Sequence, residues 1–505
     1  MKLNQLFSFF TTPEASADKT AATSVAAIEI FEREVSSICF DTRKMQPDSV
    51  FVAIKGTDSD GHDYLQEAIA KGAIALVVEN KANIPDSYPY LVVELPDTRA
   101  ALDMLASRLY SYPSQQLFCF GVTGTNGKTS ITYILEHILN ECGKKTAVMG
   151  TINHRLGERI WPSEMTTPDP VTMQSRLRDF VSEGAVAVAM EVSSHALDQK
   201  RIQSVNFDTV IFTNLTLDHL DYHKTMQNYF EAKQKLFTDM MWLTLKTPKF
   251  AVINIDDAYG RRLKVADHVI AWTYGQTEAD FQFKINKMSF TETEIEIKTV
   301  AETIKATLPI SGRHSIDNIV GSAVAALSCG ISLQQSLQAL KNFKGVPGRL
   351  EKVESQSDKI IFVDYAHTPD ALENVLTAIR QVRETSNLQN RIFTVFGCGG
   401  DRDKSKRPLM AGIAARLSDE VIVTSDNPRT ENAQSIIDDV VKGFAAGQAN
   451  FTVESDRERA IQKAINMAKP GDVVLIAGKG HEDYQIIGTE KKYFSDVAVA
   501  RKYLN

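Results

Sequence analysis

The segment Leu117-Phe-Cys-Phe-Gly-Val-Thr-Gly-Thr-Asn-Gly-Lys-Thr-Ser130 joins an apolar strand pattern to a glycine-rich loop, and a helical pattern follows over 129–142. This order is typical of a P-loop, in which backbone N–H groups and a helix N-terminus face a phosphate. Lys128 would then reach the β- and γ-phosphates, and the Thr129 hydroxyl would help to hold Mg²⁺. The strict pattern G-x-x-x-x-G-K-[ST] needs glycine at position 122, where this chain has Val122. The alternative is a glycine turn with an incidental lysine, and even a true P-loop predicts nucleoside triphosphate binding without identifying the reaction.

Outward from this segment, the chain alternates apolar runs with helical patterns, which predicts an α/β fold. Strands are expected at 50–54, 73–79, 90–95, 185–190, 209–212, 250–254, 359–363, 391–396, 420–424 and 472–477. Residues 281–308 alternate more strictly and predict antiparallel strands, whereas 64–71 and 312–328 predict helices. A length of 505 residues suits about three domains. We place them at 1–111, 112–344 and 345–505, with the polar stretch 111–116 before the second block and Gly345 at the start of the third.

Composition excludes several classes of protein. Hydrophobic residues make up 43% and charged residues 24% of the chain, as in ordinary soluble globular proteins. The net charge of −7 indicates no basic stripe for nucleic acid, so an anionic substrate would need local cationic pockets. The five cysteines form no C-x-x-C pair, and we expect neither disulfides nor a cysteine zinc site. With no signal-peptide or transmembrane pattern, we expect a cytoplasmic protein without membrane insertion.

Acidic and histidine side chains follow two of the predicted central strands. Glu191 ends one strand and His219 lies just after the next, so both are expected at the sheet edge that carries the P-loop. A carboxylate and an imidazole there could bind metal ions that bridge ATP phosphates to a second substrate. The alternative is a satisfied loop carboxylate and a core histidine. Lys233 lies in a pattern typical of an exposed helix face, and by this pattern alone it is a solvated lysine.

Charged loops follow each strand of the third block. Asp364 suits a ribose hydroxyl, and Arg402 and Arg429 suit carboxylates, which the guanidinium fork matches bidentately. Glu482 suits an ammonium group. Two arginines and one carboxylate in one site would fit a zwitterion with more than one carboxylate, such as a diamino diacid. Turn chemistry is the alternative for any single loop, Asn-Pro especially.

Taken together, these motifs resemble the Mur ligases, the ATP-dependent amino-acid-adding enzymes of peptidoglycan precursor synthesis. The resemblance covers nearly the whole chain and rests on Thr166-Thr-Pro168, Glu191-Val-Ser-Ser-His195, Asp218-His-Leu-Asp-Tyr-His223, Tyr365-Ala-His-Thr-Pro-Asp370 and Cys398-Gly-Gly-Asp-Arg-Asp-Lys404. It implies an N-terminal domain for a UDP moiety, a central P-loop ATPase domain with a parallel sheet, and a Rossmann-like C-terminal domain for the incoming amino acid. Asp426-Asn-Pro-Arg429 resembles the form that adds meso-2,6-diaminopimelate, because lysine lacks the second carboxylate that Arg429 would bind.

The resemblance also implies a set of site residues. The ATP site would comprise Gly124, Thr125, Asn126, Gly127, Lys128, Thr129, Ser130, Asn318, Arg349 and Asp364. The UDP-substrate site would comprise Phe40, Thr42, Thr57, Asp58, Ser59, Thr166, Thr167, Ser193, Gln199 and Arg201. The diaminopimelate site would comprise Arg402, Asp426, Asn427, Pro428, Arg429, Gly478 and Glu482. Lys128, Glu191, His219 and Lys233 would be catalytic, and Thr129, Glu191, His219 and Lys233 would hold Mg²⁺, with Lys233 as a carbamate.

The reaction implied by the resemblance forms an amide. ATP would phosphorylate the D-glutamyl carboxylate of UDP-MurNAc-L-Ala-D-Glu, and the amine of diaminopimelate would attack the acyl phosphate. His223 or a neighbouring carboxylate is a candidate base for that amine. The rival interpretations are a folylpolyglutamate synthase, which would lack the UDP-binding block, and a non-enzymatic nucleotide-binding homologue, which should lack Lys128, Glu191 or His219. We expect a monomer, and residues 1–30 carry no readable function.

Overall fold

The computed structural model describes residues 1–8, 30–56, 59–355, 357–385, 389–448 and 450–504. Internal contacts divide the chain into two compact units. The first comprises residues 1–274 with 324–331, and the second comprises 275–323 with 332–505. Each unit is described by itself.

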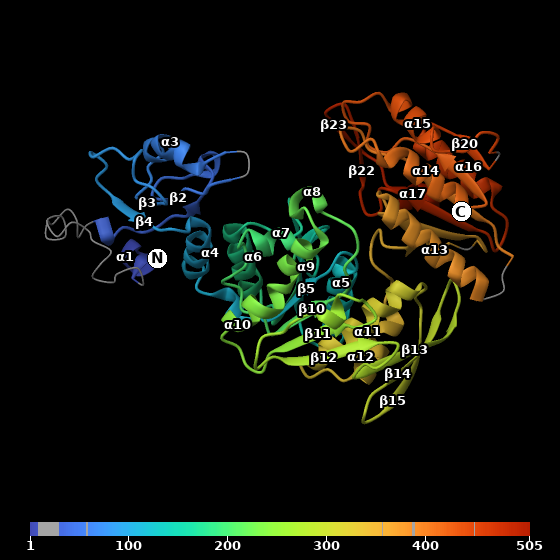
Figure 1. The fold of residues 1–505 in the computed structure, drawn as a ribbon, viewed down its shortest axis with the longest axis horizontal. Coiled ribbons are helices and arrows are strands. Elements are labelled where there is room, and N and C mark those ends of the chain that lie inside the picture. The colour runs from blue at the N-terminus through green and yellow to red at the C-terminus, as the bar shows by residue number, and fades with distance from the viewer. Residues whose placement is uncertain (9–29, 57–58, 356, 386–388, 449, 505) are drawn as a thin grey trace. The chain divides into compact units, whose positions relative to one another are not determined.

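The N-terminal part of the first unit is a small parallel sheet in the order β1-β2-β3-β4 (Figure 1). Its strands are β1 (Ile38–Cys39), β2 (Val50–Val52), β3 (Ala75–Val78) and β4 (Leu91–Glu94), and its helices are α1 (Leu3–Phe7), α3 (Leu65–Ala70) and α4 (Thr98–Leu109). Alternate strand residues point to opposite faces of a sheet. Val50 and Val52 therefore pack with α1 and α4, whereas Phe51 packs with α3.

A second sheet in this unit runs in the order β12-β11-β10-β5-β9-β6-β7-β8. Its strands are β5 (Phe118–Thr123), β6 (Thr146–Met149), β7 (Asn153–Leu156), β8 (Arg159–Pro162), β9 (Ala187–Glu191), β10 (Thr209–Phe212), β11 (Phe250–Asn254) and β12 (Ile270–Gly275). The strands from β12 to β6 are parallel, and β7 and β8 add an antiparallel edge. Helices of this part include α5 (Lys128–Glu141), α6 (Pro170–Ser182), α7 (Ser194–Asp198), α8 (Leu220–His223), α9 (Met226–Gln234) and α10 (Met241–Leu243).

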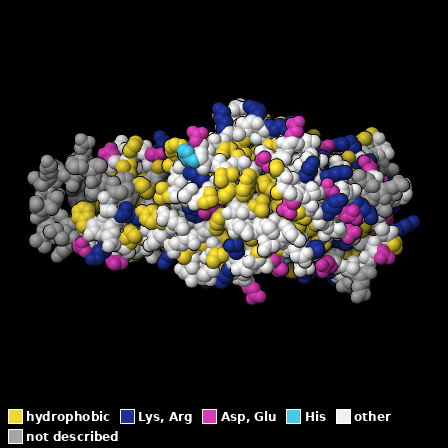
Figure 2. All heavy atoms as spheres, turned by 90° about the horizontal axis from the view of Figure 1, so that it is seen from below, with side chains coloured by type: hydrophobic (Ala, Val, Ile, Leu, Met, Phe, Trp, Pro, Cys, Tyr) yellow, Lys and Arg dark blue, Asp and Glu magenta, His cyan; other side chains and the backbone are white. Residues whose placement is uncertain are grey.

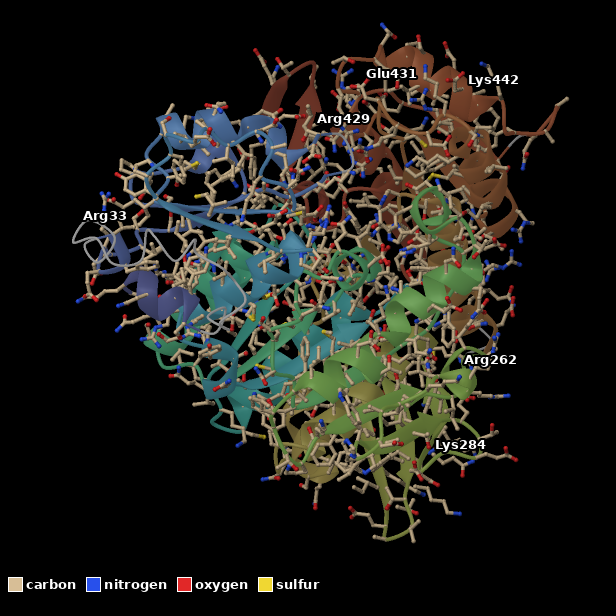
Figure 3. All side chains as sticks on the ribbon, turned by 60° about the vertical axis from the view of Figure 1, so that its left-hand side comes forward. Arg33, Arg262, Lys284, Arg429, Glu431 and Lys442 are labelled. Carbon is tan, nitrogen blue, oxygen red and sulfur yellow. The ribbon has the colours of Figure 1, made fainter. Side chains whose placement is uncertain are left out.

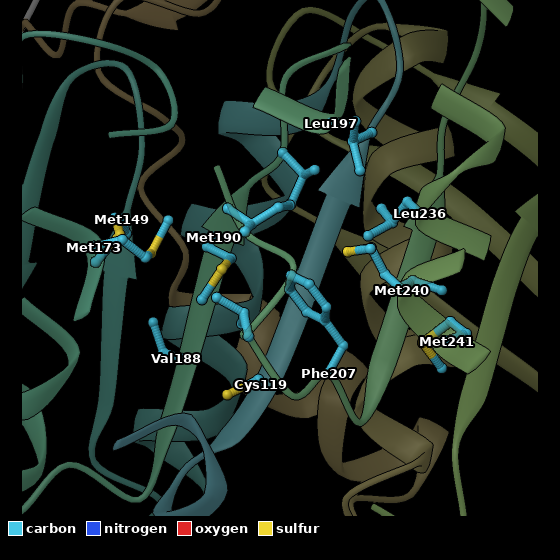
Figure 4. Packing of buried hydrophobic residues seen from close by; sticks show 14 of the residues in the cluster. Cys119, Met149, Met173, Val188, Met190, Leu197, Phe207, Leu236, Met240 and Met241 are labelled. Atoms are coloured by element: carbon cyan, nitrogen blue, oxygen red, sulfur yellow. The ribbon is translucent and has the colours of Figure 1, made fainter. Parts of the chain in front are cut away.

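The core of this sheet explains one glycine of the opening segment. Phe207 is fully buried against β5, beside Cys119 and Met190 (Figure 4). A Cβ at Gly121 would lie 2.7 Å from Cε1 of Phe207, so a larger residue there would displace the ring. Gly121 therefore provides space for core packing, one position before the glycine that the strict P-loop pattern requires.

The second unit contains an antiparallel sheet, a helical pair and a doubly wound sheet. β13 (Phe281–Met288), β14 (Thr293–Lys298) and β15 (Thr303–Leu308) pair antiparallel, as their alternation predicted. Helix α11 (Arg313–Leu327) begins in this unit and is followed by α12 (Leu333–Ala339). The C-terminal sheet has the order β16-β17-β21-β18-β19-β20, parallel except for β16 at one edge.

The strands of the C-terminal sheet are β16 (Glu351–Lys352), β17 (Ile360–Asp364), β18 (Ile392–Phe396), β19 (Glu420–Val423), β20 (Phe451–Val453) and β21 (Val473–Ala477). Its helices are α13 (Pro369–Thr385), α14 (Lys406–Leu417), α15 (Ala433–Val441), α16 (Arg457–Met467) and α17 (Asp496–Leu504), and β22 (Tyr484–Ile487) with β23 (Glu490–Tyr493) forms a hairpin. Two separate buried clusters cover the two faces, one with α13, α14 and α15 and the other with α16 and α17. This arrangement places the loops after β17, β21, β18 and β19 side by side at one edge.

The α/β fold class predicted from the sequence is confirmed. Within the described ranges, no helix is long and apolar enough to cross a membrane. Figure 2 shows basic and acidic side chains interspersed over one face of the molecule, not separated by sign.

Candidate active site

The P-loop segment connects β5 to α5 in the first unit, and two of its glycines are required by its geometry. Gly124 and Gly127 both have positive φ, 149° and 89°. A Cβ at Gly124 would lie 1.8 Å from Oγ1 of Thr213, so only glycine fits beside the neighbouring loop. Gly127 is the N-cap residue of α5, whose first backbone N–H groups lack intrahelical partners. The segment therefore has the geometry of an anion cradle despite Val122.

Lys128 lies across this loop. Its Nζ donates to the carbonyl oxygens of Gly124 at 2.9 Å and Thr125 at 2.8 Å. The carbonyl of Gly124 also accepts a hydrogen bond of 2.8 Å from Nζ of Lys233. Two lysine amines thus meet at one backbone oxygen, next to the predicted phosphate position.

The sequence pattern alone predicted that Lys233 is a solvated lysine. This prediction is wrong, because Lys233 is buried. The residue is 1% exposed in α9, and its Nζ lies 4.6 Å from the ring centre of Tyr229. Burial lowers the pKa of Lys233 well below its usual value, and the charge of Lys128 lowers it further. Tyr229 is four residues before Lys233 and is also buried, so the helical repeat could have revealed this face. Burial that lowers the pKa of an amine favours its uncharged, nucleophilic form, which is the form that reacts with carbon dioxide.

Glu191 ends β9 and is held in one orientation. Its Oε1 accepts hydrogen bonds from Oγ1 of Thr129 at 3.0 Å and from the backbone N–H of Thr151 at 2.9 Å. Its Oε2 accepts from Oγ1 of Thr151 at 3.1 Å. A Cβ at Gly150 would lie 2.2 Å from Oε1, so that glycine allows the carboxylate to approach. The structure therefore brings together Thr129 and Glu191, two predicted oxygen ligands for Mg²⁺.

His219 lies in the next loop, where its backbone adopts a positive φ of 53° before α8. Its ring centre is 4.9 Å from that of His195 and 5.9 Å from that of Tyr229. Burial lowers the pKa of His219; the charge of Asp218 opposes this effect, and the charge of Lys128 adds to it. A neutral imidazole is the form that binds a metal.

The predicted magnesium ligands, Thr129, Glu191, His219 and Lys233, fit Mg²⁺ only in part when Lys233 is unmodified. No group of three or more His, Cys, Asp or Glu side chains in the part of the chain described here could hold a metal ion. Thr129 and Glu191 supply the hard oxygen donors that Mg²⁺ prefers, but an ammonium at Lys233 would repel a cation. A carbamate at Lys233 would replace that positive charge by a further oxygen ligand, and with it the set fits.

His223 is buried at 6% exposure, and its Nε2 lies 2.9 Å from Oγ of Ser194. Burial lowers the pKa of His223, so its neutral form prevails. Its role as a base for the incoming amine stays a prediction.

A cavity of about 770 Å³ lies in the first unit, lined by strand, helix and loop residues of its N-terminal part and by residues within 165–170, Gln199 and Arg201 of its central part. Five predicted UDP-substrate residues line it: Phe40, Thr42, Ser59, Gln199 and Arg201. Thr57 and Asp58 lie outside the described residues. The wall also includes residues that sequence reasoning missed, among them Asp41, Arg43, Tyr64, Arg99, Met165 and Asp169. Arg99 and Arg201 bring positive charge to this wall, as an anionic ligand requires, whereas Arg43 is paired with Asp41 there.

The remaining predicted residues of that site connect the cavity to Glu191. Arg201 donates from Nη1 to the carbonyl of Thr167 at 3.0 Å. Oγ1 of Thr167 donates to the carbonyl of Glu191 at 2.7 Å and accepts from the N–H of Ser193 at 3.0 Å. Thr166 accepts a hydrogen bond of 3.0 Å from Oγ1 of Thr151. A chain of hydrogen bonds therefore connects Arg201, in the wall of the cavity, to Glu191, which bonds Thr129.

In the second unit, the structure brings the two predicted arginines together. A Cβ at Gly399 would lie 2.9 Å from Nη1 of Arg429 and 4.0 Å from Cγ of Arg402, so both side chains flank this glycine. Nη1 of Arg429 donates to the carbonyl of Gly400 at 2.7 Å. The backbone of Arg429, at a positive φ of 52°, pairs with the hairpin through the carbonyl of Ile486 and the N–H of Gly488.

Asn427 and Glu482 lie beside these arginines. Nδ2 of Asn427 donates to Oε2 of Glu482 at 2.9 Å, and Nζ of Lys479 lies 3.2 Å from the same oxygen. Oδ1 of Asn427 accepts from Lys479 at 3.1 Å, which fixes the amide. A Cβ at Gly478 would lie 2.7 Å from Oδ2 of Asp426. Lys479, fully buried, is a site residue that sequence reasoning missed, because the Gly-Lys-Gly loop was interpreted only through its glycine and its glutamate.

Asn318, Arg349 and Asp364 also belong to the second unit, whereas the P-loop belongs to the first. Asp364 accepts from the N–H of Leu350 at 2.6 Å and from that of Ala366 at 2.9 Å. Burial raises the pKa of Asp364, and the charge of Arg349 opposes this. Asn318 is 9% exposed in α11. Their roles at the base and ribose stay predictions.

Comparison with known proteins assigns all three parts of the chain to one family. Residues 34–110 match the Mur ligase family, catalytic domain, 122–326 the Mur ligase middle domain, and 348–480 the Mur ligase, glutamate ligase domain. A UDP-N-acetylmuramoyl-L-alanyl-D-glutamate–2,6-diaminopimelate ligase of Thermosynechococcus vestitus is 44% identical over 94% of this chain and 93% of its own length. The protein of the same name from Fusobacterium nucleatum is 41% identical over 93% of this chain and 94% of its own length. A solved structure titled with that enzyme name has a TM-score of 0.69 and 30% identity, covering 95% of this chain and 99% of that chain.

Proposed function

The chain belongs to the Mur ligase family, and from this membership we propose that it adds meso-2,6-diaminopimelate to the D-glutamyl carboxylate of UDP-MurNAc-L-Ala-D-Glu at the expense of ATP. The reaction belongs to peptidoglycan precursor synthesis. The observation that carries the choice of amino acid is the pair of arginines flanking Gly399, beside the fixed carboxylate of Glu482. Two guanidinium groups and one carboxylate match an amino-acid end that bears a carboxylate and an ammonium group.

The chemistry proceeds in two steps. An oxygen of the D-glutamyl carboxylate attacks the γ-phosphorus of ATP, the bond to the β–γ bridging oxygen breaks, and ADP leaves. The amine of diaminopimelate then attacks the acyl carbon, the carbon–oxygen bond to phosphate breaks, and the nitrogen loses its proton. Lys128 and the N–H groups at the start of α5 offset the negative charge that opposes the first step.

Magnesium would be held by Thr129, Glu191, His219 and Lys233 as a carbamate, and it would supply positive charge against the ATP phosphates. The carbamate forms when the uncharged Lys233 amine attacks carbon dioxide and an N–H proton passes to solvent. The depressed pKa of Lys233 and its burial support this modification. Its new carboxylate would remove the clash between two amines at the carbonyl of Gly124.

The cavity residues and the C-terminal loops complete the assignment. We place the UDP moiety in the 770 Å³ cavity, with the peptide arm running past Arg201 and Thr167 towards Glu191. Asn318, Arg349 and Asp364 contact the base and ribose of ATP. We assign domains to 1–111, 112–344 and 345–505, and the protein acts as a cytoplasmic monomer.

An amino-acid panel tests the function. With ATP, Mg²⁺ and UDP-MurNAc-L-Ala-D-Glu, phosphate release should depend on meso-2,6-diaminopimelate, and lysine should give about 100-fold lower kcat/KM, since it lacks a carboxylate for the arginine pair. Chromatography of the nucleotide product should show one added diaminopimelate. Equal use of lysine would refute the amino-acid assignment. Glutamate addition to a folate would indicate the rival ligase, and no turnover with any amino acid would indicate a non-enzymatic homologue.

A further inference from the structure

Two loops carry the arginines of the proposed amino-acid site, and Glu431, in one of these loops, pairs with the buried Arg407. The first loop, residues 397–404, follows β18, and the second, residues 424–431, follows β19. A Cβ at Gly400 would lie 1.9 Å from the carbonyl oxygen of Pro428, so the two loops are in backbone contact. Their separation sets the distance between Arg402 and Arg429.

The two loops are joined by reciprocal hydrogen bonds. Oε1 of Glu431, in the second loop, accepts from the backbone N–H of Asp401, in the first, at 2.6 Å. The carboxylate of Asp401 accepts in return from the backbone N–H of Thr430 at 3.1 Å and from its hydroxyl at 2.8 Å. Asp401 and Thr430 are the chain neighbours of Arg402 and Arg429. The bonds therefore act directly on the backbone from which each arginine extends.

Glu431 is oriented by a buried arginine. Arg407, in the first turn of α14, is fully buried, and its Nη2 donates to Oε1 of Glu431 at 2.9 Å. Its Nη1 donates to Oδ2 of Asp439 in α15 at 3.0 Å. Figure 3 shows Arg429 and Glu431 at the same end of the unit, with Lys442, which contacts Asp439 and directly follows α15, farther away.

This burial is costly and only partly compensated. Buried charges destabilise a protein unless hydrogen bonds satisfy them, and the Nε of Arg407 has no partner among the described residues. A buried ion pair therefore adds little to the stability of the fold. Its main effect here is to hold the two loops in one geometry. The hydrogen bond from Arg407 lowers the pKa of Glu431 to about 2, which keeps the carboxylate ionised at neutral pH.

We propose that Glu431, oriented by Arg407, is a positioning residue that sets the spacing of Arg402 and Arg429 and thereby the selectivity for an amino acid with a second carboxylate. This inference rests on the proposed function. Neither Glu431 nor Arg407 needs to touch the substrate. Bidentate carboxylate recognition depends on guanidinium placement within a fraction of an ångström, so a released loop would weaken it.

The test compares variants of Glu431 and Asp439, the two carboxylates that bind Arg407. Glu431→Gln should raise the KM for diaminopimelate about tenfold, because an amide holds the N–H of Asp401 and Arg407 less strongly than a carboxylate. The KM values for ATP and the UDP substrate should stay within about twofold. The preference for diaminopimelate over lysine in kcat/KM should fall, since lysine does not use the arginine pair. Asp439→Asn, which weakens the bond from Nη1 of Arg407 without touching the loops, should leave these values near those of the unaltered chain.

A second variant covers the case in which Glu431→Gln does not fold. Asp401→Asn lies at an exposed position with a φ of 54°, a conformation that asparagine tolerates, so it should fold. It weakens the return bonds from Thr430 and should also raise the KM for diaminopimelate selectively. The inference is overturned if neither variant changes that KM, or if Glu431→Gln and Asp439→Asn raise all three KM values alike. Failure of the proposed function is distinguished by the unaltered chain, which would then not use diaminopimelate.

Discussion

At the scale of single residues, Lys233 shows how burial changes the chemistry of a side chain. The residue lies on α9, and its buried amine is close to Lys128 and to the ring of Tyr229. Desolvation and a like charge both favour the neutral form, which is the form that reacts with carbon dioxide. From the sequence pattern alone, Lys233 cannot be told from a solvated lysine, because charged and amide side chains surround it in the sequence.

Replacement of Lys233 by methionine should lower diaminopimelate-dependent ADP formation about 100-fold, because the carbamate that would hold Mg²⁺ against the ATP phosphates cannot form. Lys264→Met, an exposed lysine of the same unit, should leave the rate unchanged. Protein incubated with isotope-labelled bicarbonate and analysed by carbon NMR should show one carbamate signal that is missing from the Lys233→Met variant. A signal of equal strength in both proteins would contradict the assignment.

At the scale of elements, the strands were predictable and the side-chain environments of the loops were not. Buried parallel strands are continuous apolar runs, so 209–212 and 250–254 agree with β10 and β11 to the residue. The P-loop and Arg429 follow such strands and Glu191 ends one, and they were found for that reason. Lys479, Arg407 and Glu431 escaped prediction because their importance depends on partners far apart in sequence, such as Asn427 for Lys479.

Helix α4 carries a buried acid that makes folding depend on pH. Asp103 is 1% exposed, and burial raises its pKa from 3.8 to about 7, despite a hydrogen bond from the N–H of Ser204 to its Oδ2. A raised carboxyl pKa means that the folded chain binds the proton more tightly than the unfolded chain. Stability is therefore highest below about pH 4 for this group and falls as the pH rises towards 7.

Asp103→Asn should remove this dependence. The natural chain should lose on the order of 2–4 kcal/mol of unfolding free energy from this group between pH 4 and pH 8, whereas the asparagine variant should not, since it stays neutral and still accepts from Ser204. Thermal unfolding of both proteins across that range measures the difference. Asp179→Asn, a partly exposed acid on α6, serves as the control. If the asparagine variant and the natural chain shift in parallel with pH, the explanation is wrong.

At the scale of the whole molecule, the proposed sites for the UDP moiety and for the amino acid belong to different units. The cavity is built by the first unit, and the arginine pair is built by the second. The two sites share no side chain, so changes at each should act on different substrates. Energetic effects at sites with no shared partners usually add.

Arg99→Gln should raise the KM for the UDP substrate about tenfold through loss of a cavity cation, and Arg429→Ala should do the same for diaminopimelate. Each single change should leave the other KM within about twofold, and the double variant should show the product of the two effects on kcat/KM. Arg33→Gln, which breaks an ion pair with Asp48 outside the cavity, is the matched control. Steady-state kinetics for each substrate provides the measurement. A strong interaction between the two changes would contradict separate sites.

The hydrogen atom that serves as the side chain of Gly399 has a consequence for enzyme redesign. A single methyl group at this position would lie only 2.9 Å from Nη1 of Arg429, so the guanidinium would have to shift, without any change of charge. Efforts to convert the ligase to a monoacidic amino acid can therefore begin with Gly399→Ala, an uncharged substitution at a residue that has no side chain of its own.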